Sequence, residues 1–257
     1  MTKRSSWALP YAIFLVLFVA LPLILIMVYA FQDGSGNFTF GNFTKFFKDA
    51  DAIGTFALSL EVAIETTAVC ILLGYPAAWI LANRKLNKSA VTIVLFIMPM
   101  WINALMRTLA TAELFHVLGV QLGKGTLLIG MVYDYLPYMV LPIYTTISKI
   151  DVRCIEAAAD LGCNGWQTVK NVVFPLSVPG IISGITMVFV PSISTFYISQ
   201  KLGGGAFDLI GDTIERQFQN KLTYHTGAAI SLVMMILILI SISIMNRFSD
   251  EDGGIVV

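Results

Sequence analysis

The stretch LPYAIFLVLFVALPLILIMVYAF, Leu9–Phe31, contains no charged side chain and decides the fold class of this protein. The hydrocarbon core of a bilayer is about 30 Å thick, and an α-helix crosses it in roughly 20 residues. Lys3 and Arg4 precede the stretch, and Val28-Tyr29-Ala30 resembles a signal-peptide cleavage site. The apolar run is longer than the roughly 7–15 residues of a signal-peptide core, so we interpret it as an uncleaved transmembrane helix.

The composition of the rest of the chain agrees with this interpretation. The 257 residues are 57% hydrophobic and 12% charged, whereas a soluble domain has about 45–50% apolar and about 25% charged residues. So little polar material cannot cover a water-facing surface, and the remaining apolar surface must face a lipid bilayer. The formal net charge is zero, which gives no indication of nucleic-acid binding. We therefore expect one transmembrane domain over residues 1–257.

The sequence predicts an all-α membrane protein with about six transmembrane helices. The six apolar stretches cover about 9–31, 58–82, 90–112, 126–147, 177–199 and 228–245. The middle four contain prolines and hydroxyl side chains, which spanning helices tolerate where neighbouring helices or a wet cavity satisfy the freed backbone groups. These helices are therefore expected to pack around a polar path.

The orientation is predicted from a short basic loop between the second and third helices. Arg84, Lys85 and Lys88 occupy this loop, and basic residues near helix ends favour the cytoplasmic side. Both termini are then expected to be cytoplasmic, as is the connection between the fourth and fifth helices.

That connection, at about 149–175, has its own helix signals. Asp151 is a good N-cap for an Ala-rich helix, and Gly162 is well placed to end it. Asn164 can cap a second short helix that runs from about Gly165 to Val172 and ends before Pro175. We expect two short helices around a glycine turn, projecting from the inner face. An ordinary amphipathic connection along the membrane is the alternative.

The same segment resembles the signature of the membrane permeases of binding-protein-dependent ABC importers. That signature is Glu-Ala-Ala, three residues, Gly, nine residues, Ile, one residue and Leu-Pro. The corresponding positions here are Glu156, Ala157, Ala158, Gly162, Val172, Phe174 and Pro175, with Val and Phe replacing Ile and Leu. The resemblance implies that this coupling loop docks into a groove of a separate ATPase, with Glu156 in polar contact and the two alanines allowing close packing.

The resemblance also implies partners and a location. The expected partners are a second related permease, two ATP-binding subunits that hold ATP and Mg, and an extracellular or periplasmic binding protein. The expected location is a bacterial cell membrane, as a multi-pass protein, with no cofactor bound by this chain. Stretches such as Tyr133-Asp134-Tyr135-Leu136-Pro137-Tyr138-Met139 and Phe196-Tyr197-Ile198-Ser199 resemble the first permease subunit of spermidine/putrescine importers. The binding protein is then expected to carry polyamines.

The sequence gives no reason to expect an enzyme. Its nearest approach to a phosphate-binding loop, Gly119–Gly125, is one residue short and has Gly125 where Ser or Thr is required. Cys70, Cys154 and Cys163 form no ligand motif, and the two histidines are far apart in sequence, so no metal site is predicted.

Four residues are predicted to line the translocation path. Asp134 lies inside an apolar stretch, where a carboxylate facing lipid costs on the order of 3 kcal/mol. Tyr138 is one turn away, Trp101 is on the third helix, and Tyr197 lies where helices of the resembled family line the path. Carboxylates and aromatic faces suit polyamine ammonium groups. The alternative for Asp134 is a structural pair with Arg107.

Two other functions stay open at this point. The first is an ABC importer permease for another small solute, such as sulfate, thiosulfate or molybdate. The second is a stand-alone secondary transporter, which typically has inverted repeats with paired broken helices; the sequence contains none that we detect.

Overall fold

The computed structural model describes residues 9–83, 87, 91–220 and 222–252. Within these ranges the regular secondary structure is entirely helical. Five spans are long and apolar enough to cross a membrane: Pro10–Ala30, Ala50–Ala82, Lys124–Ile147, Gly165–Ser194 and Tyr224–Met245. A sixth candidate is the bent pair Val91–Trp101 and Ala104–Val117. The prediction of an all-helical membrane protein is confirmed, with five or six candidate spans.

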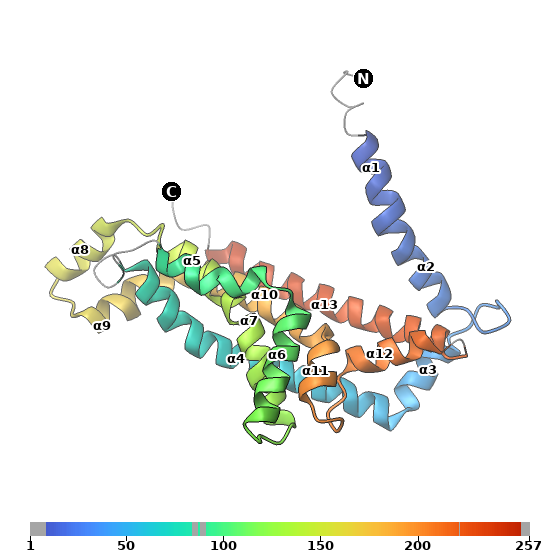
Figure 1. The fold of residues 1–257 in the computed structure, drawn as a ribbon. Coiled ribbons are helices and arrows are strands. Elements are labelled where there is room, and N and C mark those ends of the chain that lie inside the picture. The colour runs from blue at the N-terminus through green and yellow to red at the C-terminus, as the bar shows by residue number, and fades with distance from the viewer. Residues whose placement is uncertain (1–8, 84–86, 88–90, 221, 253–257) are drawn as a thin grey trace, which may run out of the picture.

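The first span consists of α1 (Leu9–Leu15), the π-helical turn η2 (Val16–Ala20) and α2 (Leu21–Ala30). The wide turn lies immediately before Pro22, whose ring and missing N–H disrupt regular α-helical bonding. The α1 end of this span projects away from the other helices (Figure 1). Only the α2 end packs against the bundle, where Ala30 is buried beside residues of α13.

The second span is longer than predicted. After α3 (Gly41–Lys48), helix α4 covers Ala50–Ala82 and so begins eight residues before the expected start. Asp49 caps it, because its carboxylate accepts hydrogen bonds from the N–H groups of Asp51 and Ala52. The first turns of α4 are polar, and hydropathy detects only the apolar part of a helix. The sequence therefore did not reveal where α4 begins.

The third span is bent, and the prediction of one continuous helix at 90–112 was wrong. Helix α5 (Val91–Ile97) tightens into the 3₁₀ turn η3 (Met98–Trp101), and α6 (Ala104–Val117) leaves at 91°. Asn103 starts α6 by accepting a hydrogen bond from the N–H of Leu105 at 2.8 Å. A proline followed by an asparagine cap therefore breaks this span.

The centre of the molecule is a bundle of α4, α7 (Lys124–Ile147) and α10 (Phe174–Ser194). Small residues allow close approach: a Cβ added at Gly184 of α10 would lie 3.2 Å from the carbonyl oxygen of Met139 in α7. After α10 the chain continues through α11 (Tyr197–Leu202) and α12 (Ile210–Gln219) to α13 (Tyr224–Asp252). Helix α10 ends at Ser194, five residues before the expected end of the fifth apolar stretch at about 199.

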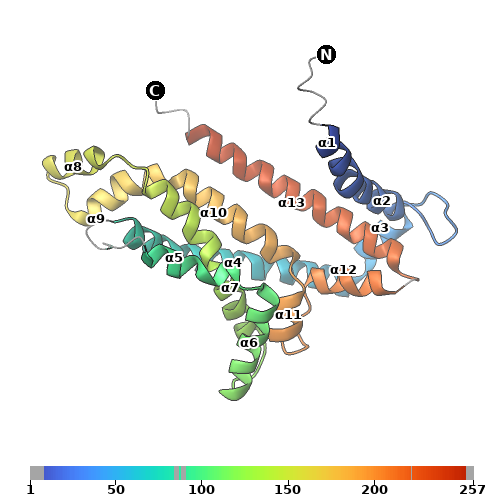
Figure 2. The ribbon, with the colours of Figure 1, turned by 45° about the horizontal axis from the view of Figure 1, so that its top comes forward.

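The short helices lie at opposite ends of the long ones. Helices α8 (Val152–Asp160) and α9 (Gly165–Thr168) are at one end, and α3 and α12 are at the other (Figures 1 and 2). This places the two groups on opposite sides of a membrane crossed by the bundle. The basic residues Arg84, Lys85 and Lys88, which decided the predicted orientation, lie outside the described residues. Which side is cytoplasmic therefore stays a prediction.

Candidate functional site

The expected pair of short helices is present. Asp151 caps α8 by accepting a hydrogen bond from the N–H of Arg153 at 2.9 Å. The chain then turns at Gly162, whose φ of +83° is in the left-handed region that favours glycine. Asn164 caps α9. The structure thus confirms the predicted cap at Asp151, the turn at Gly162 and the cap at Asn164.

The second short helix does not end before Pro175, so that part of the prediction was wrong. Helix α9 continues through the π-helical turn η4 (Val169–Val173) into α10, giving one helical run over Gly165–Ser194. The wider turn accommodates Pro175, which has no N–H and would clash in a regular α-helix. The end of the signature therefore belongs to a membrane span, and a force on α9 acts directly on α10.

The exposed surface of the loop has apolar residues at its tip. Leu161 is 85% exposed and Trp166 is 75% exposed, while Ala158 is buried. Glu156 and Ala157 lie on the exposed side of α8. Large exposed apolar side chains with a carboxylate beside them are typical of a protein contact surface.

A second polar group lies where α6 crosses α7. Nη2 of Arg107 is 3.2 Å from Oδ1 of Asp134, and the side chains are only 4% and 3% exposed. The hydroxyl of Thr108 donates to Oδ2 of Asp134 at 3.1 Å. The guanidinium carbon also lies 5.7 Å from the ring centre of Tyr133. The structural pair, one of the two alternatives considered for Asp134, is thus present.

This ion pair is incompletely bonded. Nε and Nη1 of Arg107 and Oδ1 of Asp134 are buried without a hydrogen-bond partner among the described residues. Buried polar atoms normally have partners, and an exception calls for an explanation.

The other three predicted path residues lie around the same helices. Trp101, at the end of η3, is 78% exposed. Tyr138 is partly buried on α7, with its ring centre 6.5 Å from that of Tyr135. The hydroxyl of Tyr197 donates to the carbonyl oxygen of Leu105 at 2.9 Å, which ties α11 to the first turn of α6. The structure therefore brings Tyr197 close to the α6 segment that carries Arg107, while Trp101 lies across the bend.

Two further polar clusters were not predicted as clusters from the sequence. Nζ of Lys124 contacts Oε1 of Glu61 at 2.6 Å and Oε1 of Glu65 at 2.9 Å. The i, i+4 spacing of the glutamates was a usable signal, but their partner on α7 was not identifiable from sequence.

Asp212 forms the second cluster. Its Oδ2 accepts from the hydroxyl of Ser199 at 2.6 Å and from the N–H of Leu209 at 2.7 Å. Burial raises the pKa of this carboxyl above its usual value, and the two hydrogen bonds only partly oppose the effect. No sequence signal distinguishes this buried aspartate from its exposed neighbour Asp208.

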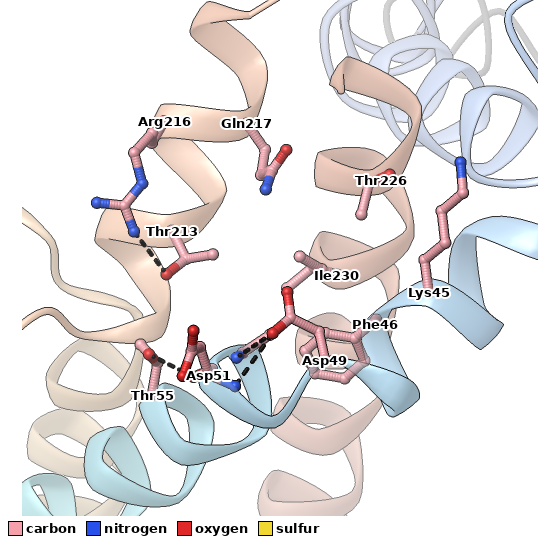
Figure 3. Close-up of a pocket in the computed structure, with 11 residues that line it drawn as sticks. Lys45, Phe46, Asp49, Asp51, Thr55, Thr213, Arg216, Gln217, Thr226 and Ile230 are labelled. Atoms are coloured by element: carbon pink, nitrogen blue, oxygen red, sulfur yellow. Dashed lines mark hydrogen bonds between the residues drawn. The ribbon is translucent and has the colours of Figure 1, made fainter. Parts of the chain in front are cut away.

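A pocket of about 160 Å³ lies between α3, α4, α12 and α13 (Figure 3). Its polar groups mostly serve the protein itself. Asp49 caps α4, and Nη2 of Arg216 donates to the hydroxyl of Thr213. We assign no ligand to this pocket. Among the described residues, no three His, Cys, Asp or Glu side chains gather closely enough to hold a metal ion.

Comparison with known families identifies the class of protein. Residues 70–252 match the family "Binding-protein-dependent transport system inner membrane component". The chain belongs to this family, and it is therefore the inner membrane permease component of a binding-protein-dependent ABC importer.

Individual permeases of named transport systems are similar to this chain over most of its length. The chain is 36% identical to the spermidine/putrescine transport system permease protein PotB of Escherichia coli (strain K12), over 86% of this chain and 89% of PotB. It is 31% identical to PotB of Haemophilus influenzae, over 91% and 89%. It is also 25% identical to PotC of Shigella flexneri, over 92% of each.

Solved structures share the fold. A bacterial ABC transporter that imports the acidic polysaccharide alginate superposes with a TM-score of 0.72 at 15% identity, covering 96% of this chain and 95% of that chain. The MetNI methionine ABC transporter superposes with a TM-score of 0.62 at 12% identity, covering 78% and 95%.

Proposed function

We propose that this chain is a polyamine permease that forms part of the path for spermidine or putrescine. The observation that carries the proposal is the similarity of 31–36% identity, over most of the chain, to spermidine/putrescine permeases. The matches to permeases for alginate and methionine are much less similar in sequence and support the fold alone.

The candidate path fits a cation of this kind. Asp134 supplies a carboxylate within the bundle, and Tyr138, Trp101 and Tyr197 supply aromatic rings on the adjoining elements. Each favourable contact between an ammonium group and an aromatic face contributes roughly 0.5–2 kcal/mol. A flexible chain with several ammonium groups would make such contacts in succession.

The α8–α9 loop is proposed to be the contact with the ATPase, on the cytoplasmic side. Glu156, Ala157 and Gly162 form the exposed part of the proposed contact, and Ala158 is buried beneath them. Val172, Phe174 and Pro175 continue into α10. Because α9 and α10 form one helical run, movement of the loop would tilt a path-lining helix. Two ATP-binding subunits, a second permease related to PotC and a polyamine-binding protein would complete the importer.

The proposal is tested by transport in a bacterium that lacks its own polyamine importers. The complete set of subunits is expressed together, and uptake of labelled spermidine, putrescine, sulfate, thiosulfate and molybdate is measured. We expect ATP-dependent uptake of at least one polyamine and of none of the oxyanions. Oxyanion uptake without polyamine uptake would contradict the proposed substrate while leaving the family assignment intact.

A further inference from the structure

The two members of the buried ion pair are held very differently. The carboxylate of Asp134 is positioned by α7 and by the hydroxyl of Thr108. The guanidinium of Arg107 has one ionic contact at 3.2 Å, and its Nε and Nη1 have no hydrogen-bond partner among the described residues. A guanidinium normally binds a carboxylate through two parallel hydrogen bonds. Oδ1 of Asp134 also lacks a hydrogen-bond partner among the described residues, so both members of the pair have unsatisfied polar atoms. The carboxylate nevertheless accepts one hydrogen bond from a third side chain, Thr108, whereas the guanidinium has no such partner.

The surroundings of the carboxylate already accept a cation in this structure. Tyr133 presents its ring to the positive charge at 5.7 Å. A carboxylate fixed by the scaffold, together with an aromatic face, is the chemistry that an alkylammonium group requires. Arg107 therefore occupies a position that a cationic cargo would also occupy.

We propose that Arg107 is a tethered substitute for the cargo cation: it neutralises Asp134 when the path is empty and is displaced by a polyamine ammonium group. This inference rests on the proposed function. The exchange conserves charge, because one cation leaves the carboxylate as another arrives. Displacement costs Arg107 its ionic contact at 3.2 Å and its position beside the ring of Tyr133. It is favoured because the two unbonded donors of Arg107 would gain partners once the side chain reaches water.

The location of Arg107 connects this exchange to movement. Arg107 is in the first turn of α6, directly after the 91° bend, and Asp134 is on α7 in the central bundle. The ion pair therefore connects α6, which follows the bend and has its own cap, to α7 in the central bundle. When the ion pair is broken, the hydrogen bond from Tyr197 to Leu105 still holds the start of α6. The hydrogen bond from Thr108 of α6 to Asp134 also remains. Cargo binding would thus loosen the contact between α6 and α7 at Arg107 without releasing the first turn of α6.

A purely structural ion pair makes a different prediction. If Arg107 serves only to neutralise a buried carboxylate, its removal leaves an orphan charge that destabilises the protein whatever the cargo concentration. Removing the carboxylate as well would then restore stability. The two explanations therefore differ in whether polyamine replaces the missing arginine.

The experiment uses the purified complex of both permeases and the ATPases, without the binding protein, since that protein would itself bind polyamine. Thermal unfolding is followed while spermidine is titrated, with sodium chloride at matched ionic strength as the reference. The variants are Arg107→Gln, Asp134→Asn and the double variant. Arg216→Gln is the matched control, because it removes an Arg–Asp pair of 2.7 Å whose side chains are 63% and 44% exposed.

In Arg107→Gln, spermidine should restore the lost thermal stability, and half-maximal stabilisation should require at least about threefold less spermidine than in wild type, because the internal competitor is gone. Asp134→Asn and the double variant should require roughly tenfold more, having lost a charged hydrogen bond. Arg216→Gln should behave as wild type. If the Arg107→Gln complex fails to assemble, Arg107→Lys should shift the titration in the same direction.

Two results would overturn the inference. One is an Arg107→Gln complex that is destabilised at every spermidine concentration and restored by Asp134→Asn, which would identify a structural pair. The other is an unchanged titration in Arg107→Lys where Arg107→Gln does not assemble. Failure of the proposed function is a separate observation, because it would appear as a lack of polyamine uptake by the wild-type importer.

Discussion

Asn164 and Gln167 cap the start of α9 reciprocally. The N–H of Asn164 donates to Oε1 of Gln167 at 2.8 Å, and the N–H of Gln167 donates to Oδ1 of Asn164 at 2.9 Å. With Gly162 two residues earlier, this capping box fixes the angle at which α9 leaves the turn. The exposed loop therefore has a defined shape and is continuous with α10.

Replacing Gly162 with valine should weaken coupling to the ATPase. A Cβ added at this position meets no atom within 4 Å, so the substitution acts only through the positive φ of +83°. A β-branched residue there costs about 1–3 kcal/mol of backbone strain. Substrate-stimulated ATP hydrolysis by the assembled importer should fall several-fold in Gly162→Val, while membrane insertion persists. Gly162→Asn is the control, since asparagine tolerates this conformation. Equal stimulation in Gly162→Val and wild type would contradict the coupling assignment.

The sidedness of the molecule can be tested by cysteine labelling. Ser35 and Gln219 are exposed near the α3 and α12 end, and Leu161 is exposed at the tip of the α8–α9 loop. In a background without Cys70, Cys154 and Cys163, an impermeant maleimide added outside intact cells should label cysteines at 35 and 219. It should not label a cysteine at 161 until the membrane is permeabilised. Labelling of position 161 in intact cells would invert the proposed orientation.

Replacing Trp101 should affect transport and leave stability nearly unchanged. The side chain is 78% exposed, so Trp101→Ala removes little buried area from this chain. If its ring contacts an ammonium group in the path, the loss of roughly 0.5–2 kcal/mol corresponds to a decrease in polyamine uptake of about 2- to 30-fold. Trp101→Phe should retain part of the activity. Labelled spermidine uptake, normalised to the amount of assembled importer, measures the effect. Wild-type uptake in Trp101→Ala would remove this residue from the path.

The buried carboxyl of Asp212 should make stability depend on pH. Its pKa is raised in the folded protein above the usual 3.8, mainly by burial. Between pH 3.8 and the raised pKa of the folded state, the folded protein binds more protons than the unfolded chain. Stability should therefore fall as the pH rises through that window. Thermal unfolding of the purified complex from about pH 4 to about pH 8 measures this slope, which should be smaller in Asp212→Asn. Asp208→Asn should reduce the slope much less than Asp212→Asn does, because the charge of Asp208 contributes less than burial to the raised pKa. An unchanged slope in Asp212→Asn would contradict the prediction.

The amino-acid sequence by itself determined the fold class, the loop helices and the family. Membrane helices are recognisable because the apolar length of Leu9–Phe31 is a local property that the bilayer thickness selects. Asp151, Gly162 and Asn164 were identifiable for a similar reason: a capping residue and a left-handed turn depend on a few neighbouring residues.

Only the tertiary structure decided how these pieces meet. The pairing of Asp134 with Arg107 depends on how α6 and α7 are rotated against each other and on the depth of Arg107, which neither segment encodes alone. The bend after Trp101 and the continuity of α9 with α10 depend on whether neighbouring helices compensate for the disrupted backbone bonding at Pro99 and Pro175. The burial of Asp212 arises from packing between segments far apart in the chain, since Ser59 of α4 accepts a hydrogen bond from the N–H of Ile210 beside it. Hydropathy sums local transfer energies, whereas these features depend on contacts between distant segments.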